Sequence, residues 1–228
     1  MKIKIYQIEH DLDKSGVRYE SYKETLKLQG EIKPSIYRQV YGGEVGCNDL
    51  EGVFNKFNTD YAPGYFTESM SVSNVVEICD GDLKGAYFVD SYGFEKIEFD
   101  AEQAISDDII KVLIIEPKKE PYEAEILNEY QAMKSAVDGP IEAVHLFEDN
   151  AFIYCNDEYR LRNFEGNRYI EGVPFAGNIM IIGDKGNGEN CSLTDSQIQQ
   201  YTELYREPDL SITQEILEED MGMTFMTW

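Results

Sequence analysis

Ile109-Ile110-Lys111-Val112-Leu113-Ile114-Ile115, followed by Pro117, is the stretch that decides how the chain is divided. Branched apolar residues of this kind are typical of a buried strand, and the proline stops it because proline lacks a backbone N–H and restricts the residue before it. The segment just upstream, residues 101–108, is polar and acidic. Because 228 residues leave room for two domains of about 100 residues each, we expect a second core to begin at this strand.

The first domain, residues 1–104, is expected to be a small α+β fold. Alternating apolar residues, and a glycine-containing loop between the last two segments, predict strands and a hairpin. The predicted strands are residues 2–6, 37–41, 72–79 and 86–90. Capping patterns predict two short helices, one that starts at a Ser21 cap and ends near Gly30 and one that starts at an Asn48 cap.

The second domain, residues 105–206, is expected to have the same class of fold, followed by a separate tail at 207–228. Its predicted strands are residues 109–115, 122–127, 141–147, 151–155 and 178–183. Helices are predicted from Asn128 to Gly139 and from a Thr194 cap to Pro208. The tail predicts an acidic helix that starts at a Ser211 cap and ends near Gly222, with an apolar terminus after it. The expected architecture is therefore two small α+β domains, each a short, mostly antiparallel sheet with one or two packed helices, plus a C-terminal helix.

The net charge of the chain is strongly negative. There are 44 Asp and Glu against 20 Lys and Arg, which gives −24. The excess runs through the whole chain, with 11 basic and 19 acidic residues in 1–104, 9 and 19 in 105–206, and none and 6 in 207–228. Such a surface repels phosphates, so direct binding to DNA, RNA or membrane is disfavoured and basic proteins are the favoured partners. Plain solubility is the alternative explanation.

No signal peptide and no long apolar run is visible, so the sequence predicts a cytoplasmic protein. Its cysteines are isolated from one another and do not have the spacing of a zinc site; they are Cys47, Cys79, Cys155 and Cys191. In a reducing compartment we expect them to be buried thiols.

Catalytic motifs are hard to find. The two histidines, His10 and His145, lack a matching nucleophile motif, and a structural role in a strand is the simpler interpretation of His145. Residues 183–188 contain the glycines of a phosphate-binding loop but not its GK[ST] order, and residues 80–82 lack the glutamate that closes a calcium loop. The sequence therefore predicts a protein that is not an enzyme and holds no cofactor or metal. An enzyme with no recognisable motif is the alternative.

The candidate partner-binding residues are acidic. Glu123 and Glu125 are expected on one face of a strand, and the tail glutamates recur at helical spacing. The full set is Glu120, Glu123, Glu125, Glu129, Glu215, Glu218, Glu219 and Asp220, together with Trp228 of the apolar terminus. A solvated face is the alternative for the carboxylates, and packing onto the second domain is the alternative for the terminus, which also contains Met223, Phe225 and Met226.

Six blocks of sequence resemble known families. The first half resembles the YodL-like domain family at 50–58, 69–76 and 86–94, and the second half is similar to the domain-of-unknown-function family 3846 at 111–117, 141–144 and 191–195. Two residues depart from the YodL-like pattern, since Asn74 stands where Asp is usual and Met70 where Leu is common. Neither family brings an established catalytic site.

The resemblance implies a setting. Both families are similar to small proteins carried on conjugative elements and phages of Firmicutes, and the namesake of the first is associated with inhibition of the actin-like cell-shape machinery. Together with the charge, this favours a non-enzymatic anti-defence inhibitor, of the anti-CRISPR or antirestriction type, that blocks the basic nucleic-acid groove of a host nuclease. The alternative is a regulator that binds an actin-like cytoskeletal protein or another host protein through the YodL-like half.

Overall fold

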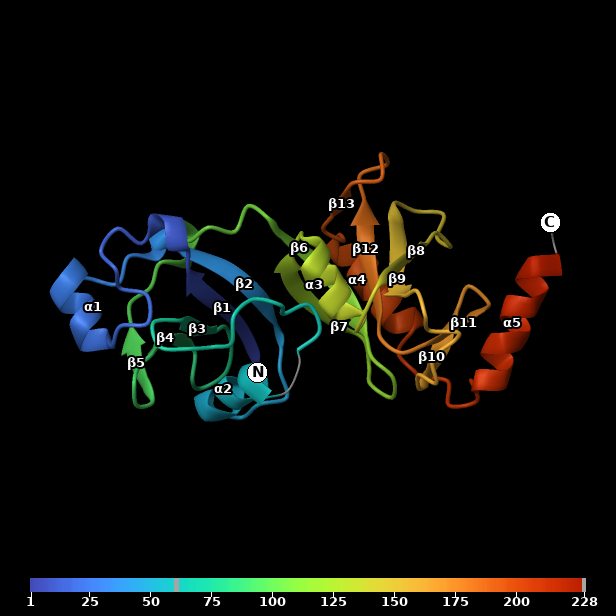
Figure 1. The fold of residues 1–228 in the computed structure, drawn as a ribbon, viewed down its shortest axis with the longest axis horizontal. Coiled ribbons are helices and arrows are strands. Elements are labelled where there is room, and N and C mark those ends of the chain that lie inside the picture. Colours follow the sequence, from blue (N-terminus) through green and yellow to red (C-terminus); the bar gives the residue numbers. More distant parts are fainter. Residues whose placement is uncertain (60–61, 227–228) are drawn as a thin grey trace. The chain divides into compact units, whose positions relative to one another are not determined.

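A computed structural model describes residues 1–59 and 62–226, with side chains described up to residue 220. The chain divides into two compact units, Met1–Ile109 and Ile110–Trp228, which are coloured along the sequence in Figure 1. Both units combine helices with antiparallel strand pairs, and a helix ends the described part of the second unit. The predicted α+β class is confirmed. Among the described residues, no helix is both long and apolar enough to cross a membrane.

The first unit is built around a sheet with the strand order β5-β4-β3-β1-β2. Its strands are β1 (Lys2–Ile8), β2 (Tyr37–Glu44), β3 (Val75–Ile78), β4 (Gly85–Val89) and β5 (Phe94–Ile97). Its α-helices are α1 (Tyr22–Gln29) and α2 (Leu50–Thr59), and short 3₁₀ helices lie at His10–Leu12, Pro34–Ile36 and Ala101–Gln103. Strand β1, which lies between β3 and β2, buries Ile3 and Ile5 by alternation, as its pattern predicts.

Local signals fix the helices of this unit well. Ser21 caps α1, and Gly30 ends it in the left-handed conformation that favours glycine (φ +85°). The predicted cap of α2 is wrong by one residue, because the carboxylate of Asp49, not the side chain of Asn48, accepts the N–H of Gly52. The strand predicted to start at residue 72 starts at Val75, since a turn precedes it.

The second unit contains a sheet with the order β7-β6-β12-β9-β8, to which β13 adds beside β12. The strands are β6 (Ile109–Ile115), β7 (Tyr122–Leu127), β8 (Ile141–Val144), β9 (Ala151–Asn156), β12 (Ile179–Asp184) and β13 (Asn190–Cys191). A separate hairpin is formed by β10 (Gly166–Ile170) and β11 (Val173–Ala176), and the helices are α3 (Tyr130–Ala136), α4 (Asp195–Leu204) and α5 (Gln214–Met226). Side chains from β6, β9, β11, β12 and α4 share one apolar core.

Three predictions for this unit are wrong in detail. Strand β8 ends at Val144, so His145 lies outside it on the surface, where its ring packs on Phe152. Helix α5 does not start at a Ser211 cap, because that hydroxyl donates to Asp209, and Thr213 instead accepts the N–H of Leu217 through its carbonyl. The helix also continues past Gly222 to Met226.

The cysteines differ in burial. Cys155 is buried, and burial raises its pKa to about 12, whereas the other three are partly exposed. The expectation of buried thiols therefore holds only for Cys155.

Candidate functional site

The predicted carboxylates of the second unit that lie near β7 are placed on its surface. Glu123 and Glu125 alternate with the buried Ala124 and Ile126, so they share one face of the strand, as expected. They also lie near Lys111 of β6: the ion pair with Asp195 is the main cause of the raised pKa of Lys111, and the charges of Glu123 and Glu125 add to it. Glu120 is exposed in the β6–β7 connection, and Glu129 is exposed just before α3.

Helix α5 divides the second predicted set. Glu215, Glu218 and Glu219 are exposed, whereas the Asp220 carboxylate pairs with Arg160 at 3.1 Å. The opposite side of the helix is packed against the unit, because Leu217 is only 1% exposed. Asp220 therefore helps to hold the helix, and the three glutamates face solvent. Trp228 lies outside the described residues.

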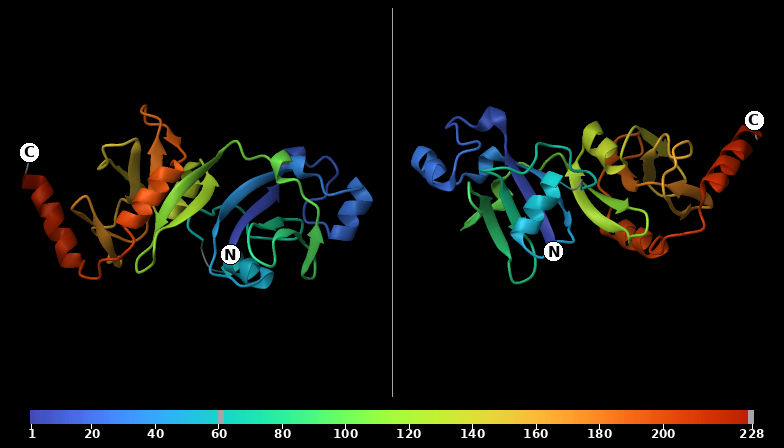
Figure 2. Two further views of the ribbon diagram at one scale, coloured as in Figure 1. Left: turned by 180° about the vertical axis from the view of Figure 1, so that it is seen from behind. Right: turned by 60° about the horizontal axis from the view of Figure 1, so that its bottom comes forward.

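The structure does not bring the two acidic sets together. Helix α5 contacts β11, whereas β7 is the last strand at one end of this unit's strand order. Figure 1 and Figure 2 both show α5 beside the β10–β11 hairpin, on the side of the unit away from β7. The acidic residues thus form two separate surfaces: the β7 surface (Glu120, Glu123, Glu125, Glu129) and the α5 surface (Glu215, Glu218, Glu219).

The basic residues of this unit are largely compensated within it. Residues 110–220 contain 9 Lys and Arg and 23 Asp and Glu. Seven of the nine cations form ion pairs: Lys111–Asp195, Lys118–Glu165, Lys119–Glu116, Arg160–Asp220, Arg162–Glu158, Lys185–Glu189 and Arg206–Glu203. An eighth, Arg168, is buried. The field outside the unit is therefore set mainly by the carboxylates that these pairs do not use.

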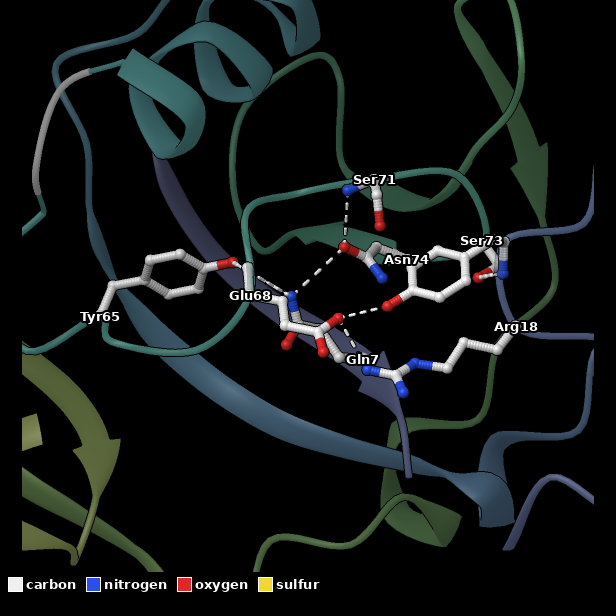
Figure 3. A network of polar contacts seen from close by, with 8 residues as sticks. Gln7, Arg18, Tyr65, Glu68, Ser71, Ser73 and Asn74 are labelled. Carbon is white, nitrogen blue, oxygen red and sulfur yellow. Dashed lines mark hydrogen bonds and ion pairs between the residues drawn. The ribbon is translucent and has the colours of Figure 1, made fainter. Parts of the chain in front are cut away.

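The first unit contains a polar network that the sequence analysis did not identify as a site (Figure 3). Asn74 is buried, and its Oδ1 accepts from the N–H of Ser71 (2.9 Å) and from Nε2 of Gln7 (3.4 Å). Gln7 Nε2 also donates to the carbonyl of Glu68 (2.8 Å) and to the hydroxyl of Tyr65 (3.1 Å). Strand β1, which carries Gln7, is thereby joined to the segment between α2 and β3.

The outer part of this network fixes an exposed tyrosine. The backbone N–H of Tyr19 donates to Ser73 Oγ (2.9 Å), and its hydroxyl donates to Glu68. Arg18 pairs with the same carboxylate (2.7 Å) and lies over the Tyr19 ring, 4.9 Å from its centroid. Both Tyr19 (φ 69°) and Ser73 (φ 75°) adopt the left-handed region that side chains rarely occupy. A 52% exposed aromatic ring is thus held in one orientation by its neighbours.

The signal for this network lies in the block that carries the YodL-like resemblance, residues 69–76. Ser71, Ser73 and Asn74 all belong to it. Both bonds to the side chain of Asn74 use its oxygen as the acceptor, so the aspartate usual at this position would accept the same two bonds. The contribution of Tyr19 could not be read from the sequence, because Tyr19 is 54 residues away from Ser73 and 49 away from Glu68, and only the fold brings them together.

Replacing Tyr19 by phenylalanine is expected to raise the pKa of Glu68 toward its ordinary value. The hydrogen bond from the Tyr19 hydroxyl is the main cause of the lowered pKa of Glu68, and Arg18 contributes less. The lowered pKa means that the ionised form of Glu68 is favoured in the folded chain. The stabilisation of the fold by this hydrogen bond is therefore present above the pKa that Glu68 has in the unfolded chain. It is lost as the pH falls through the pKa that Glu68 has in the folded chain. NMR titration of the Glu68 carboxyl carbon measures the pKa of Glu68 in both chains.

The matched control is Tyr92→Phe, since Tyr92 is 96% exposed. It should leave the Glu68 titration unchanged. An unchanged Glu68 titration in Tyr19→Phe would contradict the assigned hydrogen bond.

Within residues 1–59 and 62–226, no group of three or more His, Cys, Asp and Glu side chains could hold a metal ion. His10 lies beside Asp11 on the surface of the first unit, and His145 is exposed in the second.

Comparison with known families assigns both halves of the chain. Residues 2–99 match the YodL-like domain, and residues 110–206 match the Domain of unknown function (DUF3846). Searches of curated proteins and of solved structures gave no significant match. The motif-based resemblance is confirmed for both halves: the chain carries a YodL-like domain in its N-terminal half and a DUF3846 domain in its C-terminal half.

Proposed function

We propose that this chain is a non-enzymatic acidic binding protein of a phage or mobile element, an anti-defence inhibitor that acts in the cytoplasm. Its carboxylates would occupy the basic groove in which a host nuclease, such as a CRISPR effector or a restriction complex, holds nucleic acid. The observation that carries the proposal is the charge arrangement of residues 110–220, in which eight of the nine cations are paired or buried and most carboxylates are not in the ion pairs given above. A polyanion-binding groove attracts such a surface.

The α5 surface is the more direct candidate for this contact. Glu215, Glu218 and Glu219 project from one helix, and residues 207–228 contain no Lys or Arg that could neutralise them. The β7 surface is less suited, because Lys111 lies near Glu123 and Glu125. We therefore expect α5 to contribute more of the binding than β7.

The test uses two full-length variants that change the net charge equally. Glu215→Gln, Glu218→Gln and Glu219→Gln together neutralise the α5 surface and leave the Asp220–Arg160 pair intact. Glu95→Gln, Glu98→Gln and Glu102→Gln together remove the same charge from exposed positions of the first unit. In pull-downs and titrations against guide-loaded and restriction nucleases, the α5 variant is expected to bind on the order of tenfold more weakly, since each surface charge contributes about 0.2–1 kcal/mol. The control variant should bind like the original chain.

Ionic strength and competition complete this test. Binding should weaken as salt rises, and added nucleic acid should compete with the chain for the groove. A complex that is indifferent to salt, or that is weakened equally by both variants, would rule out the acidic-groove mechanism.

A second function is favoured by the Tyr19 network. Tyrosine and arginine are the residue types that contribute most to protein interfaces, and here Tyr19 and Arg18 are preorganised together on the YodL-like half. We propose as the alternative that this half binds an actin-like or other host protein. Tyr19→Asn, which tolerates the positive φ, should then abolish binding, while the α5 variant should bind normally and nucleic acid should not compete.

A further inference from the structure

The loop between β12 and β13 is the glycine-rich segment that resembles a phosphate cradle. Its residues Lys185 to Glu189 are exposed. The backbone N–H groups of Gly186 (2.8 Å) and Gly188 (3.3 Å) donate to Oδ1 of Asp184. The donors that would hold a phosphate are therefore occupied by the chain's own carboxylate, and the loop has a different chemistry.

Asn187 lies at the tip of this loop in a geometry that directs its side chain toward the main chain. Its Oδ1 accepts the backbone N–H of Glu189 (3.1 Å), which closes an Asx-turn. The ring closed by this hydrogen bond contains both the side-chain carbonyl of Asn187 and the peptide bond between Asn187 and Gly188. The Glu189 N–H also points at the oxygen on which negative charge would develop if that carbonyl were attacked.

The next residue places no side chain beside the attacking nitrogen, whose N–H donates to Oδ1 of Asp184. Gly188 has no Cβ, and no atom outside Gly188 and its two chain neighbours lies within 4 Å of the place where one would be. Its φ of +82° is a conformation that side chains rarely adopt. The Asn187-Gly188 pair is the single Asn-Gly sequence in the chain.

We propose that Asn187 is a site of spontaneous deamidation through a cyclic imide. The nitrogen of Gly188 loses its proton to hydroxide and attacks Cγ of Asn187, which forms a new C–N bond. The C–N bond to Nδ2 then breaks, and Nδ2 leaves as ammonia after taking a proton from water. Water finally opens the ring at either carbonyl, giving aspartate or isoaspartate, and no electrons are gained or lost.

Other asparagines lack this combination. Asn156 and Asn167 are fully buried, and their amide groups donate to main-chain carbonyls. Asn150 is exposed, but the residue after it is Ala151, whose methyl group hinders attack by the Ala151 main-chain nitrogen. Asn150 is therefore the matched reference position.

The product changes both the charge and the local pairing. Deamidation adds a carboxylate to a loop that already contains Glu189 and that follows directly after Asp184. Isoaspartate also lengthens the main chain by one carbon. Strand β13 has only two residues, paired as Gly183 with Cys191 and Asp184 with Asn190, so a change of spacing in the loop should loosen it.

The experiment follows the full-length chain during incubation at pH 6 and at pH 8. Peptide mapping by mass spectrometry should show that the Asn187 peptide converts at least tenfold faster than the Asn150 peptide. Conversion should be faster at pH 8, because the attacking nitrogen must lose its proton. Enzymatic methylation specific for isoaspartate should label the same peptide, and hydrogen exchange at residues 190–191 should become faster in the aged sample.

Asn187→Gln is the control, since glutamine keeps the amide but would have to close a larger ring. It should stop both the conversion of residue 187 and the increase in hydrogen exchange at β13 during incubation. The proposal is overturned if the Asn187 and Asn150 peptides convert at the same rate, if isoaspartate is absent from the product, or if the rate does not depend on pH.

Discussion

Replacing Arg168 by methionine is expected to lower the free energy of unfolding of the second unit by about 3–5 kcal/mol. Arg168 is only 2% exposed, on strand β10. Its guanidinium donates to five acceptors: Asn167 Oδ1 and the main-chain carbonyls of Glu116, Lys119, Tyr205 and Arg206. The side chain thus ties the β10–β11 hairpin to the β6–β7 connection and to the end of α4.

Carbonyl groups, not a carboxylate, compensate this buried charge. Burial is the main influence on the pKa of Arg168 and lowers it, while the charge of Glu207 acts in the opposite direction. Arginine nevertheless stays protonated in proteins, so the cation depends on its hydrogen bonds. Methionine fills a similar volume but donates none, which leaves buried carbonyls without a partner. Lysine at this position should also be destabilising, because one ammonium cannot span acceptors on three segments.

Urea denaturation, combined with hydrogen exchange of the amides of β10 and α4, measures this effect in the full chain. The control is Arg206→Met, which removes an exposed i,i+3 pair with Glu203 and should change the free energy of unfolding by about 0.5 kcal/mol or less. A change below about 1 kcal/mol in Arg168→Met would contradict the role assigned to this side chain.

The same residue shows why β10 was not predicted from the sequence. Gly166-Asn167-Arg168-Tyr169-Ile170 contains two polar residues that are usually exposed, yet Asn167 and Arg168 are buried and Tyr169 is the outward residue. The strand is stable because acceptors from β6 and α4 surround it, and these are remote in sequence. By contrast, β1, β6, β7 and β9 follow from alternation or from continuous apolar runs, which are local properties.

The candidate binding surfaces were also predictable from the sequence only in part. The shared face of Glu123 and Glu125 follows from the two-residue repeat of a strand, and the sequence analysis placed both correctly on it. Asp220 could not be told apart from the exposed glutamates of α5 by sequence, because its partner Arg160 is 60 residues away. Tyr19 was not identified for a similar reason, since the residues that orient it come from the segment before β3.

Gly166→Ala is expected to destabilise the second unit by about 1–3 kcal/mol, as overpacking of a close contact does. A Cβ on Gly166 would lie 2.3 Å from the carbonyl oxygen of Ile212 and 2.9 Å from the Cβ atom of Ile212. Neither atom is the end of a flexible side chain, so the backbone of the α4–α5 connection must move. That connection is also bound to β10 through the N–H of Asp209, which donates to the carbonyl of Asn167 at 2.8 Å. Movement of Ile212 should therefore disturb both β10 and the start of α5.

The position of α5 gives this prediction a second readout. Helix α5 is held by the buried side chain of Leu217 and by the Arg160–Asp220 ion pair. Leu217 and Asp220 follow Ile212 closely in sequence, so their positions depend on where Ile212 lies. Hydrogen exchange at residues 214–220 should become faster in Gly166→Ala, together with a lower denaturation midpoint. Gly46→Ala is the control, because no atom lies within 4 Å of its Cβ position, and it should change the free energy of unfolding by about 0.5 kcal/mol or less. If α5 exchange and the midpoint stay the same in Gly166→Ala, then the close approach of β10 to Ile212 is not what holds the helix in place.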